Sequence, residues 1–372
     1  MLKLMHIADV HLDSRFSGIP HSESVKKRAE LRRVFSSALA LAKKEGCKAV
    51  LIGGDLFDSE YYTEDTLAFL RDSFSSMPGC AFIIAPGNHD PYNSTSPYRF
   101  AELPSNVYVY KSESVTPLTV ASLGLTVYGY AFTSQSHPTR PLDGFARNDN
   151  GNYSVLLAHT ELDSPLSQYA PISRAELASV GFDYAALGHI HNGGDIASAG
   201  DTIYAYSGCL AGRDFGECGE KGGIIVTLDT LNGKHTVSAE RVRICPWGYE
   251  IASVPLDSAP DEDSALKLIT EAISSDKGID RVIRLCLTGQ VCYELDPAVM
   301  LRSLSKLGVK EIKDETVFAY STLALDDDFS LRGEFYRVLK PKLTSDDPAE
   351  RERAVKALKY GLSALGGCDI EY

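Results

Sequence analysis

The sequence predicts an α/β fold in which layered sheets carry helices on their outer faces, followed by a smaller α/β unit. Three observations support this prediction. Short apolar runs alternate with helical segments in the first part of the chain, and a series of strand-like runs without helices comes next. A connector rich in Pro, Asp and Ser then covers residues 255–264 and precedes new strand and helix signals. Because the composition changes near Pro246, we expect one domain at residues 1–245 and a second at residues 246–372.

The individual elements follow from composition and spacing. Six short runs rich in Val, Ile, Leu and Tyr are typical of buried strands, at residues 2–8, 49–53, 81–85, 125–131, 153–158 and 183–187. Apolar residues from Leu31 to Ala42 recur at helical spacing, and Gly46 provides a stop, so a helix separates the first two strands. The strands without helices are expected at residues 203–206, 223–229 and 236–244.

The second unit has its own pattern. We expect helices at residues 265–274 and 297–307, and strands at residues 281–287, 309–312 and 317–320. A final helix is expected to begin at Asp347-Pro348, because Asp is a favoured N-cap and Pro is favoured at the first helical position.

Composition limits the possible functions. The 372 residues carry a net charge of −13, which argues against broad nonspecific binding to nucleic acid. No apolar run approaches the roughly 18 residues that span a bilayer, and Asp9 and His11 would interrupt a signal peptide. The eight cysteines form no C-x-x-C pair, so we expect reduced thiols. These features predict a cytoplasmic protein that does not insert into a membrane.

Polar motifs follow five of the predicted strands. They are Asp9-Val10-His11, Gly54-Asp55-Leu56-Phe57-Asp58, Gly87-Asn88-His89-Asp90, Ala158-His159-Thr160 and Gly188-His189-Ile190-His191. Each of the first four motifs alone is more often a turn or a core histidine than a ligand, whereas Gly188-His189-Ile190-His191 favours neither reading. Because sites in open α/β sheets form at the carboxyl ends of strands, five such turns can converge on one place.

The residue types in these motifs predict a metal site. Carboxylates, imidazoles and a carboxamide together suit Mn, Fe or Zn, and the candidate ligands are Asp9, His11, Asp55, Asn88, His159, His189 and His191. Asp55 is the natural bridge between two ions, and ions about 3.5–4 Å apart can activate a water and hold a phosphoryl oxygen. His89 is the candidate catalytic residue, either stabilising transition-state charge or protonating the leaving oxygen. Asp58 and Asp90 are expected to be turn residues or hydrogen-bond acceptors behind the ligands.

The five motifs in this order resemble the calcineurin-like metallophosphoesterase superfamily. The first strand, residues 5–12, and the segment from Tyr169-Ala170-Pro171 into Gly188-His189-Ile190-His191 resemble SbcD-type DNA repair nucleases. Residues 206–222 are similar to the YhaO-like branch of that group. The resemblance is strong over residues 1–245 and weak beyond them. It implies a four-layer α/β/β/α catalytic domain, a small α/β capping domain that helps to select the substrate, and manganese-dependent cutting of DNA.

The resemblance also implies roles for individual residues. One ion would be held by Asp9, His11, Asp55 and His191. The other would be held by Asp55, Asn88, His159 and His189, with His89 as the catalytic histidine. A coiled-coil ATPase of the SbcC type and a second copy of the chain are the implied partners. Relatives often have a basic residue and a proline after the last motif, where this chain has Asn192-Gly193-Gly194, so the rim of the site differs.

Three functional hypotheses result. The leading one is a metal-dependent DNA phosphodiesterase in repair, either an exonuclease or an endonuclease. The alternative keeps the chemistry and changes the substrate to a small nucleotide or a phosphoprotein. The third is a noncatalytic scaffold for an ATPase partner.

Overall fold

The computed structural model describes residues 1–59, 61–274, 280–291, 293, 295–318 and 325–365. It divides into two compact units, Met1–Tyr249 and Glu250–Tyr372. The first unit contains two six-stranded sheets. Across the first sheet lie β12 (Lys234–Arg243), β11 (Gly222–Leu231), β1 (Leu2–Ile7), β2 (Ala49–Ile52), β3 (Ala81–Ile84) and β4 (Val107–Val109). Across the second lie β5 (Thr116–Val120), β6 (Leu125–Gly129), β7 (Tyr153–His159), β8 (Tyr184–Gly188), β10 (Thr202–Tyr206) and β9 (Ala197–Ala199).

Each sheet has a parallel centre. Strands β1 to β4 run parallel to one another, and so do β6, β7, β8 and β10. The outer strands β11 and β12 pair antiparallel with their neighbours, and so do β5 and β9. The carboxyl ends of the parallel strands in each sheet therefore meet at one edge, where the polar motifs begin.

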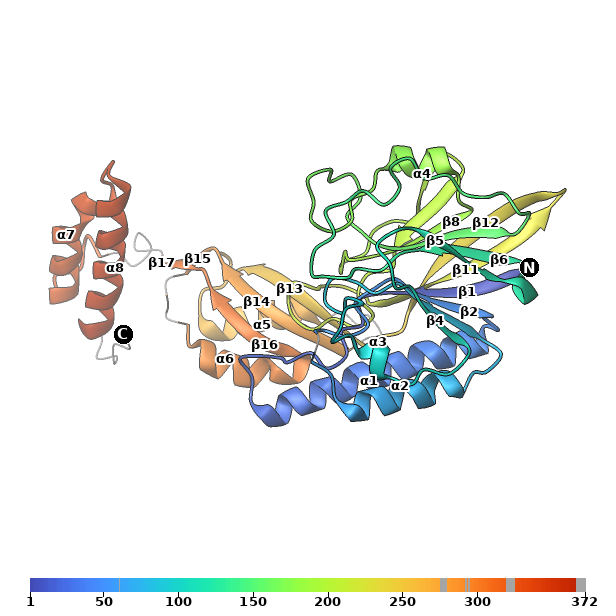
Figure 1. Cartoon of the computed structure of the whole chain (residues 1–372). Helices are drawn as coiled ribbons and strands as arrows, with labels where there is room; N and C mark the ends of the chain where they lie inside the picture. The colour runs from blue at the N-terminus through green and yellow to red at the C-terminus, as the bar shows by residue number, and fades with distance from the viewer. Residues whose placement is uncertain (60, 275–279, 292, 294, 319–324, 366–372) are drawn as a thin grey trace. The chain divides into compact units, whose positions relative to one another are not determined.

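Alternating side chains build four layers. In β1, Met5 and Ile7 face the helices α1 (His21–Lys44) and α2 (Glu64–Ser75), whereas Leu4 faces the second sheet. In β7, Leu157 faces the first sheet, and Leu156 faces α4 (Arg174–Val180). Figure 1 shows α1 and α2 along one side of the paired sheets and α4 on the other. The expected α/β/β/α sandwich is confirmed.

Most predicted elements of this unit are present, but three helices were not predicted. The helix around Leu31 to Ala42 is confirmed, and it ends before Gly46, which has φ +72°. Helix α2 begins after Thr63, whose hydroxyl accepts a hydrogen bond from the Thr66 amide. Helix α4 has a complete capping box between Ser173 and Glu176. A four-residue helix, α3 (Pro97–Phe100), and a 3-10 turn (Ala121–Leu123) complete the unit.

The second unit is a small α/β module. Its main sheet contains β13 (Trp247–Pro255), β14 (Asp280–Thr288) and β16 (Val309–Asp314), and a short pair joins β15 (Gln290–Val291) to β17 (Val317–Phe318). Helices α5 (Glu262–Ile273) and α6 (Pro297–Leu304), followed by a 3-10 turn (Ser305–Leu307), share an apolar core with this sheet. Part of the predicted strand at residues 317–320 lies outside the described residues.

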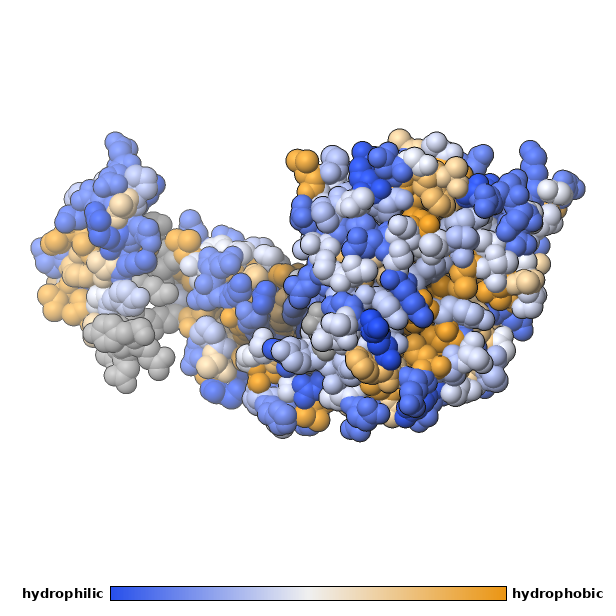
Figure 2. Space-filling view, in the orientation of Figure 1, coloured by the Kyte–Doolittle hydropathy of each residue, from blue (hydrophilic) through white to orange (hydrophobic). Residues whose placement is uncertain are grey.

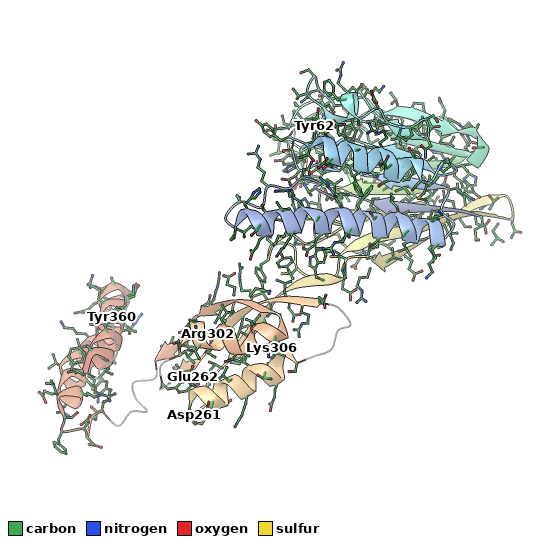
Figure 3. The ribbon with its side chains drawn as sticks, turned by 90° about the horizontal axis from the view of Figure 1, so that it is seen from below. Tyr62, Asp261, Glu262, Arg302, Lys306 and Tyr360 are labelled. Atoms are coloured by element: carbon green, nitrogen blue, oxygen red, sulfur yellow. The ribbon has the colours of Figure 1, made fainter. Side chains whose placement is uncertain are left out.

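The predicted connector at residues 255–264 is shorter than expected. Asp261 caps α5 by accepting a hydrogen bond from the Ser264 amide at 2.8 Å, so the last residues of the connector are already helical. Figure 3 labels Asp261 and Glu262 at this helix start. Asp261 is therefore the helix cap, and Glu262 and Asp263 lie in the first helical turn.

The described chain ends in a helical hairpin. Helices α7 (Leu331–Leu343) and α8 (Pro348–Leu365) pack through Tyr336, Leu358 and Leu362. Leu331 and Val338 remain exposed, and Figure 2 shows hydrophobic residues on one face of the hairpin. Among the described residues, no helix combines the length and apolarity needed to cross a membrane.

Candidate metal centre

The candidate ligands leave the carboxyl ends of strands from both sheets. Asp9 and His11 follow β1, Asp55 follows β2, His159 is the last residue of β7, and His189 comes directly after β8. The turns after β1 and β2 are joined by backbone hydrogen bonds, from the Asp9 amide to the Gly54 carbonyl at 3.1 Å and from the His11 amide to the Asp55 carbonyl at 3.0 Å. Motifs that are far apart in sequence are thus fixed at one edge.

The backbone at these ligands is strained. Asp9, His11, Asp55 and His189 have φ values of +50°, +51°, +52° and +103°, in a region that residues other than glycine rarely adopt. Each such residue costs on the order of 1–3 kcal/mol, and such strain concentrates at functional sites. Four candidate ligands share this strained backbone. The fold therefore tolerates a local cost in backbone energy in order to hold these side chains in place.

Two glycines make room for the ligands. A Cβ atom added to Gly54 would lie 2.3 Å from His159 Nδ1, and one added to Gly87 would lie 2.2 Å from Asp55 Oδ1. Neither distance is tolerable for nonbonded atoms. The glycines of these motifs therefore let buried ligand side chains pack directly against the neighbouring turns.

The first predicted ligand set lies together. One side-chain ligand atom from each of Asp9, His11, Asp55 and His191 falls within 4.8 Å of the other three. His11 Nε2 is 3.1 Å from His191 Nε2 and 3.9 Å from Asp55 Oδ2. His191 Nε2 is also 3.9 Å from Asp9 Oδ1. Two imidazoles and two carboxylates thus face one small volume.

The second predicted set is adjacent. His159 Nε2 lies 2.9 Å from Asn88 Oδ1 and 3.5 Å from Asp55 Oδ2. The rings of His159 and His189 are 5.1 Å apart between centroids, in an edge-to-face arrangement. Asp55 Oδ2 is therefore close to ligand atoms of both sets, as a bridging carboxylate would be.

The histidine partners favour a cation between the rings. His191 Nδ1 lies 2.7 Å from Glu217 Oε1, and a carboxylate acceptor keeps the ring proton on Nδ1. His11 Nδ1 similarly faces Asp58 Oδ1 at 3.1 Å, although this contact lies outside hydrogen-bond geometry. In the neutral rings, both Nε2 lone pairs then point at each other across 3.1 Å. A metal ion would relieve that repulsion, so the donor set fits the implied ions.

Burial favours the uncharged forms of several candidate ligands and shifts their pKa values accordingly. It raises the pKa of Asp9 to about 8, against the opposing effect of His191. It lowers the pKa of His11 to about 4, of His159 to about 3 and of His189 to about 4. Neutral imidazoles offer lone pairs at neutral pH, and a buried carboxylate is stabilised by a nearby cation. Burial also opposes the charged form of His191, but its hydrogen bond with Glu217 and the nearby charge of Asp9 together raise its pKa instead. A bound cation would therefore have to displace the proton of Asp9, whereas His11, His159 and His189 already offer lone pairs.

Glu217, Arg213 and Asp58 form an ionic bridge behind the histidines. Arg213 Nη2 lies 2.7 Å from Glu217 Oε1, and Arg213 Nη1 lies 2.7 Å from Asp58 Oδ1. One guanidinium thus connects the carboxylates that face Nδ1 of His191 and of His11. Burial opposes the charged form of Glu217, but its hydrogen bonds with His191 and Arg213 lower the pKa of its carboxyl.

Sequence reasoning missed this role of Glu217 and Arg213. The two residues have the i, i+4 spacing of an ion pair, but they lie in a loop, and nothing local indicates that they reach His191. Asp58 was expected to be an acceptor or a turn residue, and it is an acceptor. Partners that orient the far nitrogen of a ligating histidine commonly set its tautomer and basicity.

Asp90 connects two of the ligand-bearing turns. Its fully buried carboxylate accepts hydrogen bonds from the amides of Leu56, Phe57 and Gly87 and from the hydroxyl of Tyr98. Leu56 follows Asp55, and Gly87 precedes the Asn88 turn. Asp90 therefore fixes the spacing of these turns, consistent with the expected role as an acceptor.

His89 lies at the exposed edge of the centre. Its amide donates to Asp55 Oδ1 at 2.9 Å, and its Nδ1 lies 2.8 Å from the Asp58 carbonyl oxygen. Because a carbonyl only accepts, Nδ1 carries a proton and Nε2 remains available. The His89 ring lies edge to face against His11, with centroids 5.0 Å apart. An exposed imidazole beside the ligand cluster is well placed to contact a substrate.

Comparisons with known proteins agree with this geometry. The family model described as calcineurin-like phosphoesterase matches residues 2–193. The protein named uncharacterized metallophosphoesterase YhaO from Bacillus subtilis is 26% identical over 304 residues, which cover 77% of this chain and 72% of that protein.

Two relatives carry the name DNA double-strand break repair protein Mre11. The one from Aeropyrum pernix is 29% identical over 233 residues, and the one from Saccharolobus solfataricus is 26% identical over 219 residues. Each match covers 56% of this chain and 54% of the Mre11 protein. The family model covers more than half of the chain and includes all five motifs. The chain belongs to the calcineurin-like phosphoesterase family and is a metal-dependent phosphoesterase.

Proposed function

We propose that this chain is a metal-dependent DNA phosphodiesterase that acts in DNA repair. The observation that carries the proposal is the convergence of seven candidate ligands from both sheets beside the exposed His89. The two relatives named as double-strand break repair proteins support DNA as the substrate. The match to the YhaO protein extends over more of the chain but adds no substrate.

The proposed ligands divide into two groups. Asp9, His11, Asp55 and His191 would hold one ion, and Asp55, Asn88, His159 and His189 would hold the other. Bound divalent ions would supply Lewis-acid stabilisation of charge on the phosphoryl oxygens. Manganese is the expected metal, and the mixed N and O donors also suit Fe and Zn.

The protein's own groups would set the tautomers of the ligating histidines and place His89 beside the substrate. Glu217 keeps the His191 proton on Nδ1, and the Gly53 carbonyl, 2.9 Å from His159 Nδ1, does the same for that ring. Their Nε2 atoms are thereby left free to ligate. His89 presents Nε2 toward the open side, where it would stabilise transition-state charge or donate a proton to the leaving oxygen.

A gel assay on end-labelled DNA tests the proposal. Single- and double-stranded substrates would be incubated with manganese, with chelator, and with the His89→Ala variant. We expect cutting that requires both manganese and His89, and the fragment pattern distinguishes exonuclease from endonuclease. Absence of cutting by correctly metallated protein would contradict the nuclease function.

The net charge of −13 favours a second candidate, hydrolysis of a small nucleotide or a phosphoprotein. A small chromogenic phosphodiester compared with DNA at matched manganese separates the two. Turnover of the small diester alone would favour the second candidate. Binding of fewer than two ions per chain, without turnover of either, would instead favour a scaffold for an ATPase partner.

Location and assembly remain predictions. We expect a cytoplasmic protein that works with a coiled-coil ATPase of the SbcC type and forms a homodimer. The unit after Tyr249 is the proposed capping domain. The match to each of the two Mre11 proteins covers 54% of that protein. Co-purification of a tagged chain with a coiled-coil ATPase, and its mass in solution, would test these predictions.

A further inference from the structure

A cationic cavity lies beside the metal centre. It has a volume of about 110 Å³, several times the minimum for one water. Its charged lining residues are Glu220, Lys221, Arg241 and Arg243, and His191 and Ser207 also line it. The cavity thus shares His191 with the candidate metal centre but lies among residues to which none of the functions above assigns a role.

Lys221 is a buried cation without a carboxylate partner. Only 4% of the residue is exposed, and its ammonium donates to the His191 carbonyl at 3.2 Å and to Asn192 Oδ1 at 3.1 Å. Across the described parts of the chain, no carboxylate oxygen lies within 4.0 Å of Lys221 Nζ. Both acceptors are neutral, so they take two of the three ammonium hydrogens and leave the positive charge uncompensated. A buried charge in that state is costly unless a counterion joins it.

Arg241 adds a second cation, on an exposed residue whose guanidinium is held by backbone carbonyls. Its guanidinium donates to the carbonyls of Ser207 at 3.1 Å and Tyr206 at 2.7 Å, and to the carbonyl of Gly194. These acceptors are again neutral. Within the described residues, Arg241 makes no ion pair. The contacts fix the planar guanidinium against the turn after His191, so its orientation is set before any ligand arrives.

The remaining charges do not neutralise the cavity. Arg243 lies 3.7 Å from Glu220, and this exposed pair cancels within itself. Lys221 and Arg241 therefore leave two positive charges in a protein whose net charge is −13. Metal ions bound beyond His191 would make the surroundings still more positive.

We propose that this cavity binds a phosphate group. If the chain is the DNA phosphodiesterase proposed above, on which this identification rests, the group is a phosphodiester next to the one that is cut. Lys221 and Arg241 would supply its positive contacts. Because both Nη2 hydrogens of Arg241 are donated to carbonyls, Arg241 would contact the phosphate through Nε or the second Nη1 hydrogen. The cavity would then set the register of the strand across the metal centre, because phosphate contacts position a nucleic acid without reading its sequence.

The first test measures phosphate binding without activity. Inorganic phosphate would be titrated into the full-length, metal-free protein by calorimetry, so that metal ions contribute nothing. We expect Arg241→Gln to weaken binding about tenfold, the size of one charge-assisted hydrogen bond. Arg241→Lys, which keeps the charge, should lose less.

The matched control is Lys234→Gln, at the opposite end of β12. It removes the same charge about 22–24 Å along the strand from Arg241, so phosphate binding should be unchanged. Equal binding in wild-type protein and Arg241→Gln would overturn the proposal. So would equal losses in Arg241→Gln and Arg241→Lys, because the backbone contacts of Arg241 and not its charge would then matter.

The second test distinguishes a strand phosphate from free phosphate. With manganese-loaded protein, Arg241→Gln should raise KM for an oligonucleotide more than for a small diester that has a single phosphate. It should also reduce the salt dependence of oligonucleotide binding by about one phosphate contact. Equal effects on both substrates would overturn the strand-phosphate assignment. If wild-type protein cuts no DNA, the proposed function fails, and the phosphate titration still decides whether the cavity binds an oxyanion.

Discussion

Removing the Glu217 carboxylate should weaken metal binding through the tautomer of His191. Glu217 Oε1 accepts the Nδ1 proton of His191 at 2.7 Å, and Arg213 Nη2 lies 3.3 Å from the same nitrogen. In Glu217→Ala, Arg213 is the close partner of Nδ1 that remains among the residues that the structure describes. An arginine only donates, so it favours a proton on Nε2 instead, and a protonated Nε2 cannot ligate a metal.

The size of the effect follows from this contact. A hydrogen bond to a charged group contributes about 1.5–3 kcal/mol, which corresponds to about 10- to 100-fold in affinity. Because Glu217 touches only the first ligand set, we expect this loss for one ion and little change for the other. Glu217→Gln keeps an acceptor oxygen but lacks the charge, so its loss should be intermediate.

Manganese titration with a competing chelator measures both affinities. Glu220→Gln is the control, because it neutralises an exposed carboxylate on the same segment and should bind both ions as wild-type protein does. Wild-type affinity in Glu217→Ala would refute the tautomer argument. An equal loss at both ions would show that the substitution disturbs the whole edge of the sheets.

Three further predictions concern packing, pH and metal removal. Gly87→Ala should weaken manganese binding more than tenfold, because its Cβ would collide with the Asp55 carboxylate, whereas Gly79→Ala, which meets nothing within 4 Å, should bind manganese normally in the same titration. Burial lowers the pKa of His6 in the folded state to about 3. As pH falls, the unfolded state therefore takes up the His6 proton first. The contribution of neutral His6 to the stability of the folded state is present above about pH 6.5 and is lost as pH falls toward 3. Urea unfolding should therefore show wild-type protein losing up to about 1.4 kcal/mol per pH unit more than His6→Gln in this window, and parallel curves would contradict it. Manganese at 100 times its dissociation constant should raise the free energy of unfolding by about 2.7 kcal/mol per ion, and an unchanged melting temperature after chelation would contradict binding to the folded state.

The sequence predicted the layers because hydrophobic periodicity determines them. The alternation of Met5 and Ile7 with Leu4 is visible in the letters, and so is the helical spacing from Leu31 to Ala42. Helix α4 has a readable start signal in Ser173-x-x-Glu176, but its seven residues are too few to show a clear helical periodicity. Helix α2 was harder to predict, because its cap at Thr63 is not followed by a capping-box Glu or Gln.

The candidate ligands could be predicted because each follows a strand in a recognisable motif. Their supporting residues could not, because their contacts bridge long separations in the chain. Arg213 reaches Asp58 across 155 positions, and Lys221 reaches the carbonyl of His191 across 30. Only the folded chain shows that these loops meet. The effect of Glu217 on the His191 tautomer and the cationic cavity could therefore not be predicted from the sequence.

Metal content tests the central claim most directly. Full-length protein would be saturated with manganese, freed of excess ions, and measured by elemental analysis beside His159→Ala and Lys234→Gln. The two-set arrangement predicts two ions per chain in wild-type protein and in Lys234→Gln, and about one in His159→Ala. Fewer than two ions in wild-type protein, or two ions that persist in His159→Ala, would contradict the proposed centre.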